Sequence, residues 1–391
     1  MKVALIVEWL DAWRGGAETS TQQFLHHLMD MGVSLHVFTR SRPSPTPGMK
    51  VHTITGASMS RTRRSMTFAI RVERLVRAES FDVIHAISPC LCADIYQPRG
   101  GTVAETIERN VATRHRPAMR YIKRTATKLD LKQRYMLAME RKIMGAGRRP
   151  LVVAISDYVV RQLKNHYDLP DSRIRKVYNG VDVDDPGAER RTRDRKTIRD
   201  DFAIPPDDML VLLVAHNFRL KGVMRWMEAL AGLVKRGERN IRSLVVGRGD
   251  SQRWRRLALR LGIKDYLTFT GSSDRVRMFR HAADILVHPT YYDPCSRVVL
   301  ESMASGLPCI TTGWDGASEM VEDGRNGFVL HDLGNTDELM DRVYRLRDVG
   351  LRRDFAETAR QVAPHISMAR HAAEMVSLYE EMASARTRLC S

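Results

Sequence analysis

Cysteine is scarce in this sequence of 391 residues, and no two cysteines stand in a Cys-x-x-Cys spacing. The five are Cys90, Cys92, Cys295, Cys309 and Cys390. This pattern disfavours a disulfide-stapled fold, a structural zinc site and a thioredoxin-type motif, and it indicates a reducing compartment. A chain of this length, roughly two or three domains of about 150 residues, can bury large cores without covalent staples.

Long apolar runs are also missing. No run approaches the ~18 residues of a membrane-spanning helix. The start of the chain carries Lys2 and Glu8, so it does not resemble a secretory signal. We therefore expect a cytoplasmic protein that does not cross a bilayer.

Acidic residues are outnumbered, with 46 Asp and Glu against 63 Lys and Arg, which gives a formal net charge of +17. Such a surplus favours anionic partners, namely nucleic acid, phospholipid headgroups or phosphorylated substrates. About half of the surplus lies in residues 101–150, which hold 13 basic and 4 acidic residues.

Apolar β-branched runs alternate with stretches of helical spacing in both halves of the chain. The predicted strands are 3–7, 33–39, 81–86, 151–155, 209–215, 242–246, 267–270, 285–288 and 308–311. This alternation predicts an α/β protein with parallel sheets covered on both faces. Residues 184–203 are polar and have no apolar period, so they are a predicted linker between domains at 1–183 and 204–365. An amphipathic tail helix is predicted within 366–391.

The densest signal runs from His288 to Pro308 and reads HPTYYDPCSRVVLESMASGLP. A strand is predicted to end at His288, and a helix to run from about Ser296 to Ser305, with Gly306 as its stop signal. In an open α/β sheet, ligands bind beyond the carboxyl ends of the strands. A helix that starts there offers N–H groups and a positive dipole end to a phosphate.

Two carboxylates belong to this segment, Asp293 in the loop and Glu301 in the helix. Both could accept hydrogen bonds from sugar hydroxyls. The alternative is that Asp293 caps the helix and Glu301 is a solvated helix residue.

The spacing of Asp293 and Glu301 resembles the carboxylate-x7-carboxylate signature of retaining GT-B glycosyltransferases (glycosyltransferases group 1). This family includes lipopolysaccharide-core glucosyltransferases, bacterial mannosyltransferases and sucrose synthase-like enzymes. It usually has Glu where Asp293 stands. The resemblance covers nearly the whole chain. It implies two Rossmann-like doubly wound domains that face a central cleft, with the acceptor on the first, the nucleotide sugar on the second, and residues 366–391 packed back on the first.

Landmarks of this family also occur in the first half. Gly15-Gly16-Ala-Glu18 resembles the GGxE loop near the donor phosphate, although a lone Gly-Gly also fits an ordinary turn. His85 stands at a strand end where the family often has a histidine near the donor sugar, whereas a lone histidine there is more often structural. Tyr178-Asn-Gly-Val-Asp182 resembles the NGVD signature, which also accounts for Asp182 in the metal-site-like spacing Asp182-Val-Asp184.

The second half contains a basic pair and two glycine loops. Arg219 and Lys221 resemble the pair that binds the donor diphosphate, and the alternative is two surface charges at a helix start. Cations at a helix start are opposed by the helix dipole, a conflict that an anionic ligand would remove. Gly247, Gly271 and Ser272 follow two later strands and resemble loops that contact the nucleoside.

The resemblance implies that a hexose passes from a nucleotide sugar to an acceptor hydroxyl with retention of configuration. Arg219, Lys221 and the helix start would hold the diphosphate, Glu301 the ribose and Asp293 the sugar hydroxyls. The helix start comprises the donor-binding residues Cys295, Ser296 and Arg297. We expect UDP-glucose as donor, with GDP-mannose as the alternative. Neither a metal nor a cofactor is expected.

The basic segment around residues 109–149 interleaves cations with apolar residues. Arg116, Arg120, Lys123, Arg124 and Lys128 are expected to contact an anionic membrane or an anionic glycolipid, at about 1 kcal/mol per cation. A solvated helix face is the alternative. The expected acceptor is a glycolipid or cell-envelope polysaccharide such as lipopolysaccharide core, at the inner face of the cell membrane.

Two other classes of function stay open. The isoelectric point near 10.0 fits a nucleic-acid-binding protein, but the sequence contains no recognised nucleic-acid module. A degenerate transferase that binds glycan without turnover would explain Asp293 and also Arg297, where the family usually has a small residue.

Overall fold

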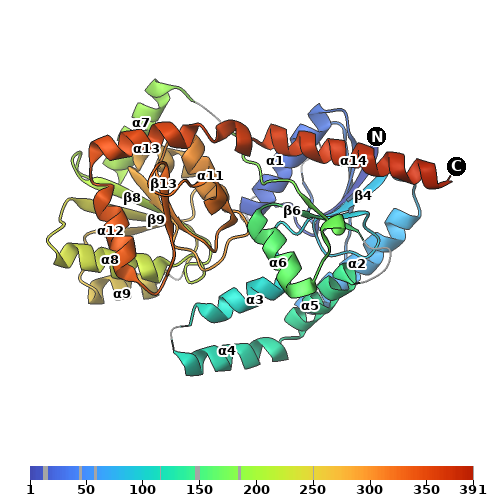
Figure 1. Cartoon of the computed structure of the whole chain (residues 1–391), viewed down its shortest axis with the longest axis horizontal. Coiled ribbons are helices and arrows are strands. Elements are labelled where there is room, and N and C mark those ends of the chain that lie inside the picture. Colours follow the sequence, from blue (N-terminus) through green and yellow to red (C-terminus); the bar gives the residue numbers. More distant parts are fainter. Residues whose placement is uncertain are drawn as a thin grey trace. The chain divides into compact units, whose positions relative to one another are not determined.

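The computed structural model describes residues 1–11, 16–43, 46–56, 60–114, 116–145, 150–183, 186–249 and 251–390. The chain divides into two compact units (Figure 1). The first unit comprises Met1–Asp182 and Ile366–Ser391, and the second unit comprises Val183–His365.

The first unit has a parallel sheet of seven strands in the order β3-β2-β1-β4-β5-β6-β7. The strands are β1 (Lys2–Ile6), β2 (Ser34–Thr39), β3 (Met49–Thr53), β4 (Val83–Ala86), β5 (Ile95–Tyr96), β6 (Leu151–Ala154) and β7 (Ile174–Lys176). The helices are α1 (Gly16–Asp30), α2 (Arg61–Arg77), α3 (Val103–Ala112), α4 (Pro117–Leu129), α5 (Leu131–Met144), α6 (Asp157–Tyr167) and α14 (Met368–Cys390). Apolar side chains of β1, β2, α1 and α14 form its core.

The second unit has a parallel sheet of six strands in the order β10-β9-β8-β11-β12-β13. Its strands are β8 (Met209–Val214), β9 (Ile241–Val246), β10 (Leu267–Gly271), β11 (Ile285–Val287), β12 (Cys309–Thr312) and β13 (Gly327–Leu330). Its helices are α7 (Ala188–Asp201), α8 (Val223–Lys235), α9 (Ser251–Arg260), α10 (Val276–Ala282), α11 (Arg297–Ala304), α12 (Thr336–Arg345) and α13 (Val349–Arg360). Trp226 is buried in its core and donates a hydrogen bond from Nε1 to Ser243 Oγ at 2.7 Å.

The interval expected to be a linker, 184–203, instead contains helix α7, which packs against α10. This helix is held largely by polar contacts. Asp194 lies 2.7 Å from His281 Nδ1, and Arg199 donates to Asp284 at 2.8 Å. Because polar contacts hold it, this packed helix has no apolar stripe that the sequence could show. The linker prediction was wrong for residues 188–201.

Helix α14 lies along α1 in the first unit (Figure 1). Met375 and Tyr379 on α14 are fully buried. The Tyr379 hydroxyl shares a hydrogen bond of 2.7 Å with Nδ1 of His85 on β4. The tail helix thus completes the core of the unit that also contains the start of the chain.

Replacing Tyr379 by Phe should lower the free energy of unfolding by about 1–3 kcal/mol, because the buried His85 Nδ1 loses its partner. Urea denaturation followed by circular dichroism measures this loss. The exposed Tyr344, replaced by Phe, is the matched control and should change stability by less than about 0.5 kcal/mol. Equal effects of the two substitutions would contradict the role of the buried contact.

Candidate donor site in the second unit

Three loops meet at the carboxyl ends of β8, β11 and β12. The N–H of Tyr291, after β11, donates to the carbonyl of Leu220, after β8, at 2.8 Å. The N–H of Asp293 donates to the carbonyl of Trp314, after β12, at 2.9 Å. The N–H of Gly316 donates back to the carbonyl of Asp293 at 3.0 Å. Asp293 is therefore fixed by backbone bonds at the edge of the sheet where ligands of α/β proteins bind.

Lys221 and Asp293 form an ion pair at this edge. Lys221 Nζ lies 2.5 Å from Asp293 Oδ2 and donates to the carbonyl of Tyr292 at 3.2 Å. The two side chains are only 20% and 16% exposed, so water screens the pair weakly. The next residue, Gly222, has φ +68°, and a Cβ there would lie 1.8 Å from the carbonyl oxygen of Pro289. Only glycine allows the loop of Lys221 to approach the loop of Asp293 this closely.

Asp293 stays ionised despite its burial. Its Oδ1 accepts a hydrogen bond from the Cys295 N–H at 3.3 Å, and His288 Nε2 lies 3.5 Å from its Oδ2. Burial acts to raise the pKa of Asp293, but the charge of Lys221 and the contact with His288 outweigh it and hold the pKa far below the usual value. A fixed negative charge thus stands next to a fixed positive charge.

Asp315 is a site residue that the sequence reasoning missed. Its side chain is fully buried and accepts hydrogen bonds from the N–H groups of Ser296 and Ala317, both at 2.9 Å, and from the Thr311 hydroxyl at 2.8 Å. It therefore fixes the start of α11 beside Asp293. The Asp-Gly pair that follows β12 was the available signal, but nothing in the sequence shows that this turn reaches Ser296.

Glu301 is held by two arginines. Arg280 Nη1 of α10 lies 2.5 Å from one carboxylate oxygen, and Arg297 Nη2 lies 2.8 Å from the other. Burial acts to raise the pKa of Glu301, but the two guanidinium groups outweigh it and keep the pKa below the usual value. The unusual Arg297 thus pairs with Glu301 one helical turn away.

The glycine loops that follow β9 and β10 are tied together. The N–H of Gly247 donates to the carbonyl of Gly271 at 2.8 Å, and Arg248 Nε lies 3.4 Å from Ser272 Oγ. Gly247 has φ +135°, and a Cβ there would lie 1.8 Å from the carbonyl oxygen of Ala215. On this sheet β9 neighbours β8 and β10 neighbours β9, so these loops continue the edge on which Lys221 and Asp293 lie. Arg219 is half-buried in the turn that carries Lys221.

The site residues predicted in the first unit have different outcomes. Gly15 lies outside the described residues, and Gly16 is the exposed first residue of α1. His85 was expected near the donor sugar, but its side chain is fully buried against Tyr379. Burial and the charge of Arg99 lower the pKa of His85 to about 3. His85 is a neutral core histidine and has no exposed surface to offer a sugar, so the donor-site assignment is wrong.

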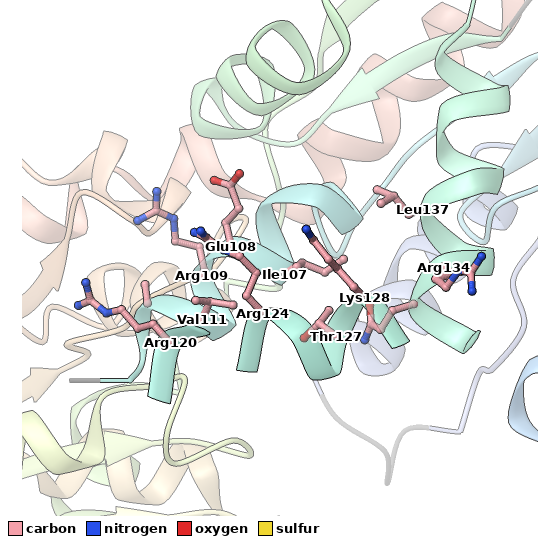
Figure 2. Close-up of a pocket in the computed structure, with 12 residues that line it drawn as sticks. Ile107, Glu108, Arg109, Val111, Arg120, Arg124, Thr127, Lys128, Arg134 and Leu137 are labelled. Carbon is pink, nitrogen blue, oxygen red and sulfur yellow. The ribbon is translucent and has the colours of Figure 1, made fainter. Parts of the chain in front are cut away.

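The predicted basic contact residues lie at α4, on which no residue is buried. Arg120, Arg124 and Lys128 line a pocket of about 610 Å³ between α3, α4 and α5. Figure 2 shows Arg124 and Lys128 pointing to the same side of α4, toward α3. Arg116 is exposed and Lys123 is half-buried. Apolar residues of α4 are exposed as well, namely Met119, Tyr121, Ile122 and Leu129.

Asp315 gives the site a measurable pH response. Burial, and then the charge of Asp293, raise the pKa of Asp315 from 3.8 to about 6. The folded protein therefore holds this proton to a higher pH than the unfolded chain. The contribution of Asp315 to stability is most favourable below about pH 4 and is lost as the pH rises to about 6. The shift corresponds to about 3 kcal/mol at most.

The substitution Asp315→Asn should remove this loss, since an amide keeps the acceptor for Ser296 and Ala317 and carries no charge. Relative to the wild type, the variant should gain stability between about pH 4 and pH 6, up to about 3 kcal/mol. Thermal denaturation across that range measures the difference. A difference that does not change with pH would contradict the titration of Asp315.

Comparisons with known proteins address both halves of the chain. The family model "Glycosyltransferase Family 4" matches residues 14–185, and "Glycosyl transferases group 1" matches residues 194–362. Lipopolysaccharide glucosyltransferase WaaG of Escherichia coli (strain K12) is 28% identical over 237 residues, which are 60% of this chain and 63% of that protein. D-inositol 3-phosphate glycosyltransferase 2 of Catenulispora acidiphila is 30% identical over 231 residues, which are 55% of this chain and 53% of that protein. The matches thus span little more than half of these relatives.

Solved structures match over nearly the whole chain. The crystal structure of WaaG has a TM-score of 0.80 at 22% identity and covers 96% of this chain and 99% of that chain. The structure of Anabaena Alr3699/HepE in complex with UDP-glucose has a TM-score of 0.70 at 18% identity and covers 96% and 99%. Within the described residues, no helix is both long enough and apolar enough to span a bilayer. The two family models, one on each half of the chain, confirm the predicted resemblance to glycosyltransferases, and the shared fold confirms the predicted GT-B fold class.

Proposed function

We propose that this protein transfers a hexose from a nucleotide sugar to an acceptor hydroxyl, with retention of configuration. The observation that carries the proposal is the Lys221–Asp293 ion pair at the carboxyl ends of β8 and β11, close to the start of α11. A nucleoside diphosphate needs fixed cations, and its sugar needs fixed hydrogen-bond acceptors. This edge of the second unit offers both.

In this proposal each charged group has a separate task. Lys221 and Arg219 neutralise the diphosphate as it departs, which lowers the barrier because negative charge grows on the leaving oxygen. The positive end of the α11 dipole adds to the stabilisation of the phosphates. Asp293 accepts hydrogen bonds from the sugar, and Glu301 from the ribose. Because Arg280 and Arg297 already hold Glu301, its carboxylate is oriented before the nucleotide arrives.

Retention is proposed to follow from attack on the face from which the diphosphate leaves. The acceptor oxygen forms the new bond to the anomeric carbon, the bond from that carbon to the phosphate oxygen breaks, and the leaving phosphate oxygen takes the acceptor's proton. The step needs neither a protein nucleophile nor a metal ion. Positioning and charge stabilisation supply the rate.

UDP-glucose is the proposed donor, and GDP-mannose is the alternative. Two comparisons support the first choice: WaaG is a lipopolysaccharide glucosyltransferase, and HepE was crystallised with UDP-glucose. Other relatives have other substrates, as the name D-inositol 3-phosphate glycosyltransferase states. The proposed acceptor is an anionic glycolipid of the cell envelope, such as lipopolysaccharide core.

The α4 region supports an amphiphilic acceptor at the inner face of the cell membrane. Its basic side chains Arg120, Arg124 and Lys128 border a pocket whose lining also includes the apolar residues Val111 and Leu137. Tyr121 and Leu129 are 74% and 73% exposed on α4 itself. A helix with exposed apolar and basic residues suits the interface of an anionic membrane, and the pocket suits a phosphate-bearing group of the acceptor.

Substituting Lys221 by Ala, or Glu301 by Gln, should reduce transfer at least about a hundredfold, because the leaving charge or the ribose loses its partner. Product formation from UDP-glucose, measured by mass spectrometry, tests this. Thermal-shift titration with UDP-glucose and GDP-mannose identifies the donor, and the Lys221→Ala variant should lose the shift.

The matched control is Lys235→Ala, an exposed lysine at the end of α8, which should keep full transfer. Circular dichroism must show that all variants are folded, since Glu301→Gln also leaves Arg280 and Arg297 without a counter-charge. Transfer near the wild-type rate in a folded Lys221→Ala variant would contradict the proposed site.

Replacing Arg120, Arg124 and Lys128 together by Gln should weaken binding to phosphatidylglycerol-containing vesicles by about a hundredfold, at about 1 kcal/mol per cation. Vesicle co-sedimentation measures it, and added salt should weaken the wild type in the same direction. A triple Gln variant of Lys235, Arg260 and Arg353, all exposed in the second unit, removes the same charge and should bind like the wild type. Equal losses in both triple variants would show a general charge effect and contradict a role for α4.

A further inference from the structure

Two histidines and a glutamate converge near the edge of the sheet in the first unit, away from the donor site. His36 lies on β2, His52 lies on the edge strand β3, and Glu79 lies between α2 and β4. Their possible ligand atoms all lie within 4.8 Å of one another. Lys2 opens β1 and Glu79 precedes β4, so these two residues lie toward the amino ends of the parallel strands, whereas His52 is the last but one residue of β3. Catalytic groups of such sheets lie at the opposite ends.

Two of the three ligand-to-ligand distances in this group are close to those of a zinc site. His36 Nδ1 lies 3.1 Å from His52 Nε2 and 3.5 Å from Glu79 Oε1. Ligand atoms about 2.0–2.1 Å from a tetrahedral Zn²⁺ lie about 3.3 Å from one another. These two distances are therefore close to the edge length of that tetrahedron, and the third, between His52 and Glu79, is at most 4.8 Å.

The chemistry of the three side chains also suits a metal. Imidazole nitrogens and a carboxylate oxygen are ligands that zinc takes in proteins. His36 is buried and His52 is half-buried, and Glu79 supplies the anionic ligand.

The ammonium group of Lys2 already lies beside Glu79. Lys2 Nζ lies 2.8 Å from Glu79 Oε1 and 4.9 Å from the centre of the Phe81 ring. The Lys2 and Glu79 side chains are 35% and 32% exposed, so the ammonium can turn out to solvent when another cation binds Glu79. Lys2 is thus the natural competitor of a metal ion.

We propose that His36, His52 and Glu79 bind Zn²⁺ and that the ion ties the edge strand β3 to β2 and to the connection that precedes β4. Water from the exposed side completes the tetrahedral coordination. The site is structural and takes no part in the proposed transfer reaction. The zinc proposal therefore does not depend on the proposed function. The second group with possible ligand atoms, Glu105, Glu108 and His166, is less suited because Glu105 is bound by Arg109 at 2.6 Å and by Tyr158 at 2.8 Å.

Calorimetric titration of the untagged, chelator-treated chain with Zn²⁺ tests the proposal. The wild type should bind one ion at this site and melt at a higher temperature with Zn²⁺ than without. His52→Gln should lower the affinity at least about tenfold. Lys2→Met should raise it, because the competing ammonium is gone. With Co²⁺ as the probe, the wild type should show the visible absorption of a tetrahedral ion, and His52→Gln should lose it.

Glu108→Gln, in the second group, is the matched control and should keep the wild-type affinity. Circular dichroism of the metal-free proteins must show that His52→Gln is folded. If it does not fold, Lys2→Met decides the matter, and an affinity equal to or weaker than that of the wild type overturns the proposal. Unchanged zinc affinity in folded His52→Gln, or loss of binding in Glu108→Gln, overturns it as well.

Discussion

The candidate donor site depends on keeping one carboxylate charged where water barely reaches it. Removing Asp293 and Lys221 from water costs more than their attraction returns unless hydrogen bonds satisfy the remaining polar atoms. Those bonds are present: Asp293 accepts from Cys295, and Lys221 donates to the carbonyl of Tyr292. The backbone bonds among the loops after β8, β11 and β12 keep both partners in place. A site fixed in this way does not have to reorganise when a charged leaving group forms, and this is the condition under which electrostatic stabilisation is effective.

Asp315 lies beside Asp293, and the two carboxylates differ in pKa. Asp293 and Asp315 are close enough for the charge of one to oppose ionisation of the other. The charge of Lys221 favours the ionised form of Asp293. Asp315 is enclosed by N–H groups and a hydroxyl, and its pKa is the raised one. One carboxylate is thus available as an anionic acceptor at neutral pH, and the other serves the backbone at the start of α11. Environment, and not residue type, assigns these two roles.

The sequence was sufficient where local order determines three-dimensional position. In a parallel sheet, residues that follow strands gather at one edge, so the placement of Lys221, Asp293, Gly247 and Gly271 followed from predicted strand ends. It failed where a contact joins distant segments. The burial of His85 depends on Tyr379, almost three hundred positions along the chain. Helix α7 has no apolar stripe because ion pairs with residues of the β11 region hold it. The Asp-Gly pair marks the turn at Asp315, but no pattern shows that this turn reaches Ser296. The edge strand β3 and the two-residue strand β5 were also missed, since neither has a long apolar run.

The positive surplus is distributed in a way that net charge alone does not show. In the second unit, many arginines are neutralised internally: Arg280 and Arg297 share Glu301, and Arg195 and Arg199 share Asp284. These arginines stabilise the structure, and because their charges are paired they add little to the electrostatic potential outside the protein. The basic residues of α4 differ from these paired arginines. Within the described part of the chain, Arg120, Arg124 and Lys128 form no ion pair with a carboxylate, and they border a pocket. Unpaired cations beside apolar side chains produce a strong local potential, and this is the basis of the proposed contact between α4 and an anionic amphiphile.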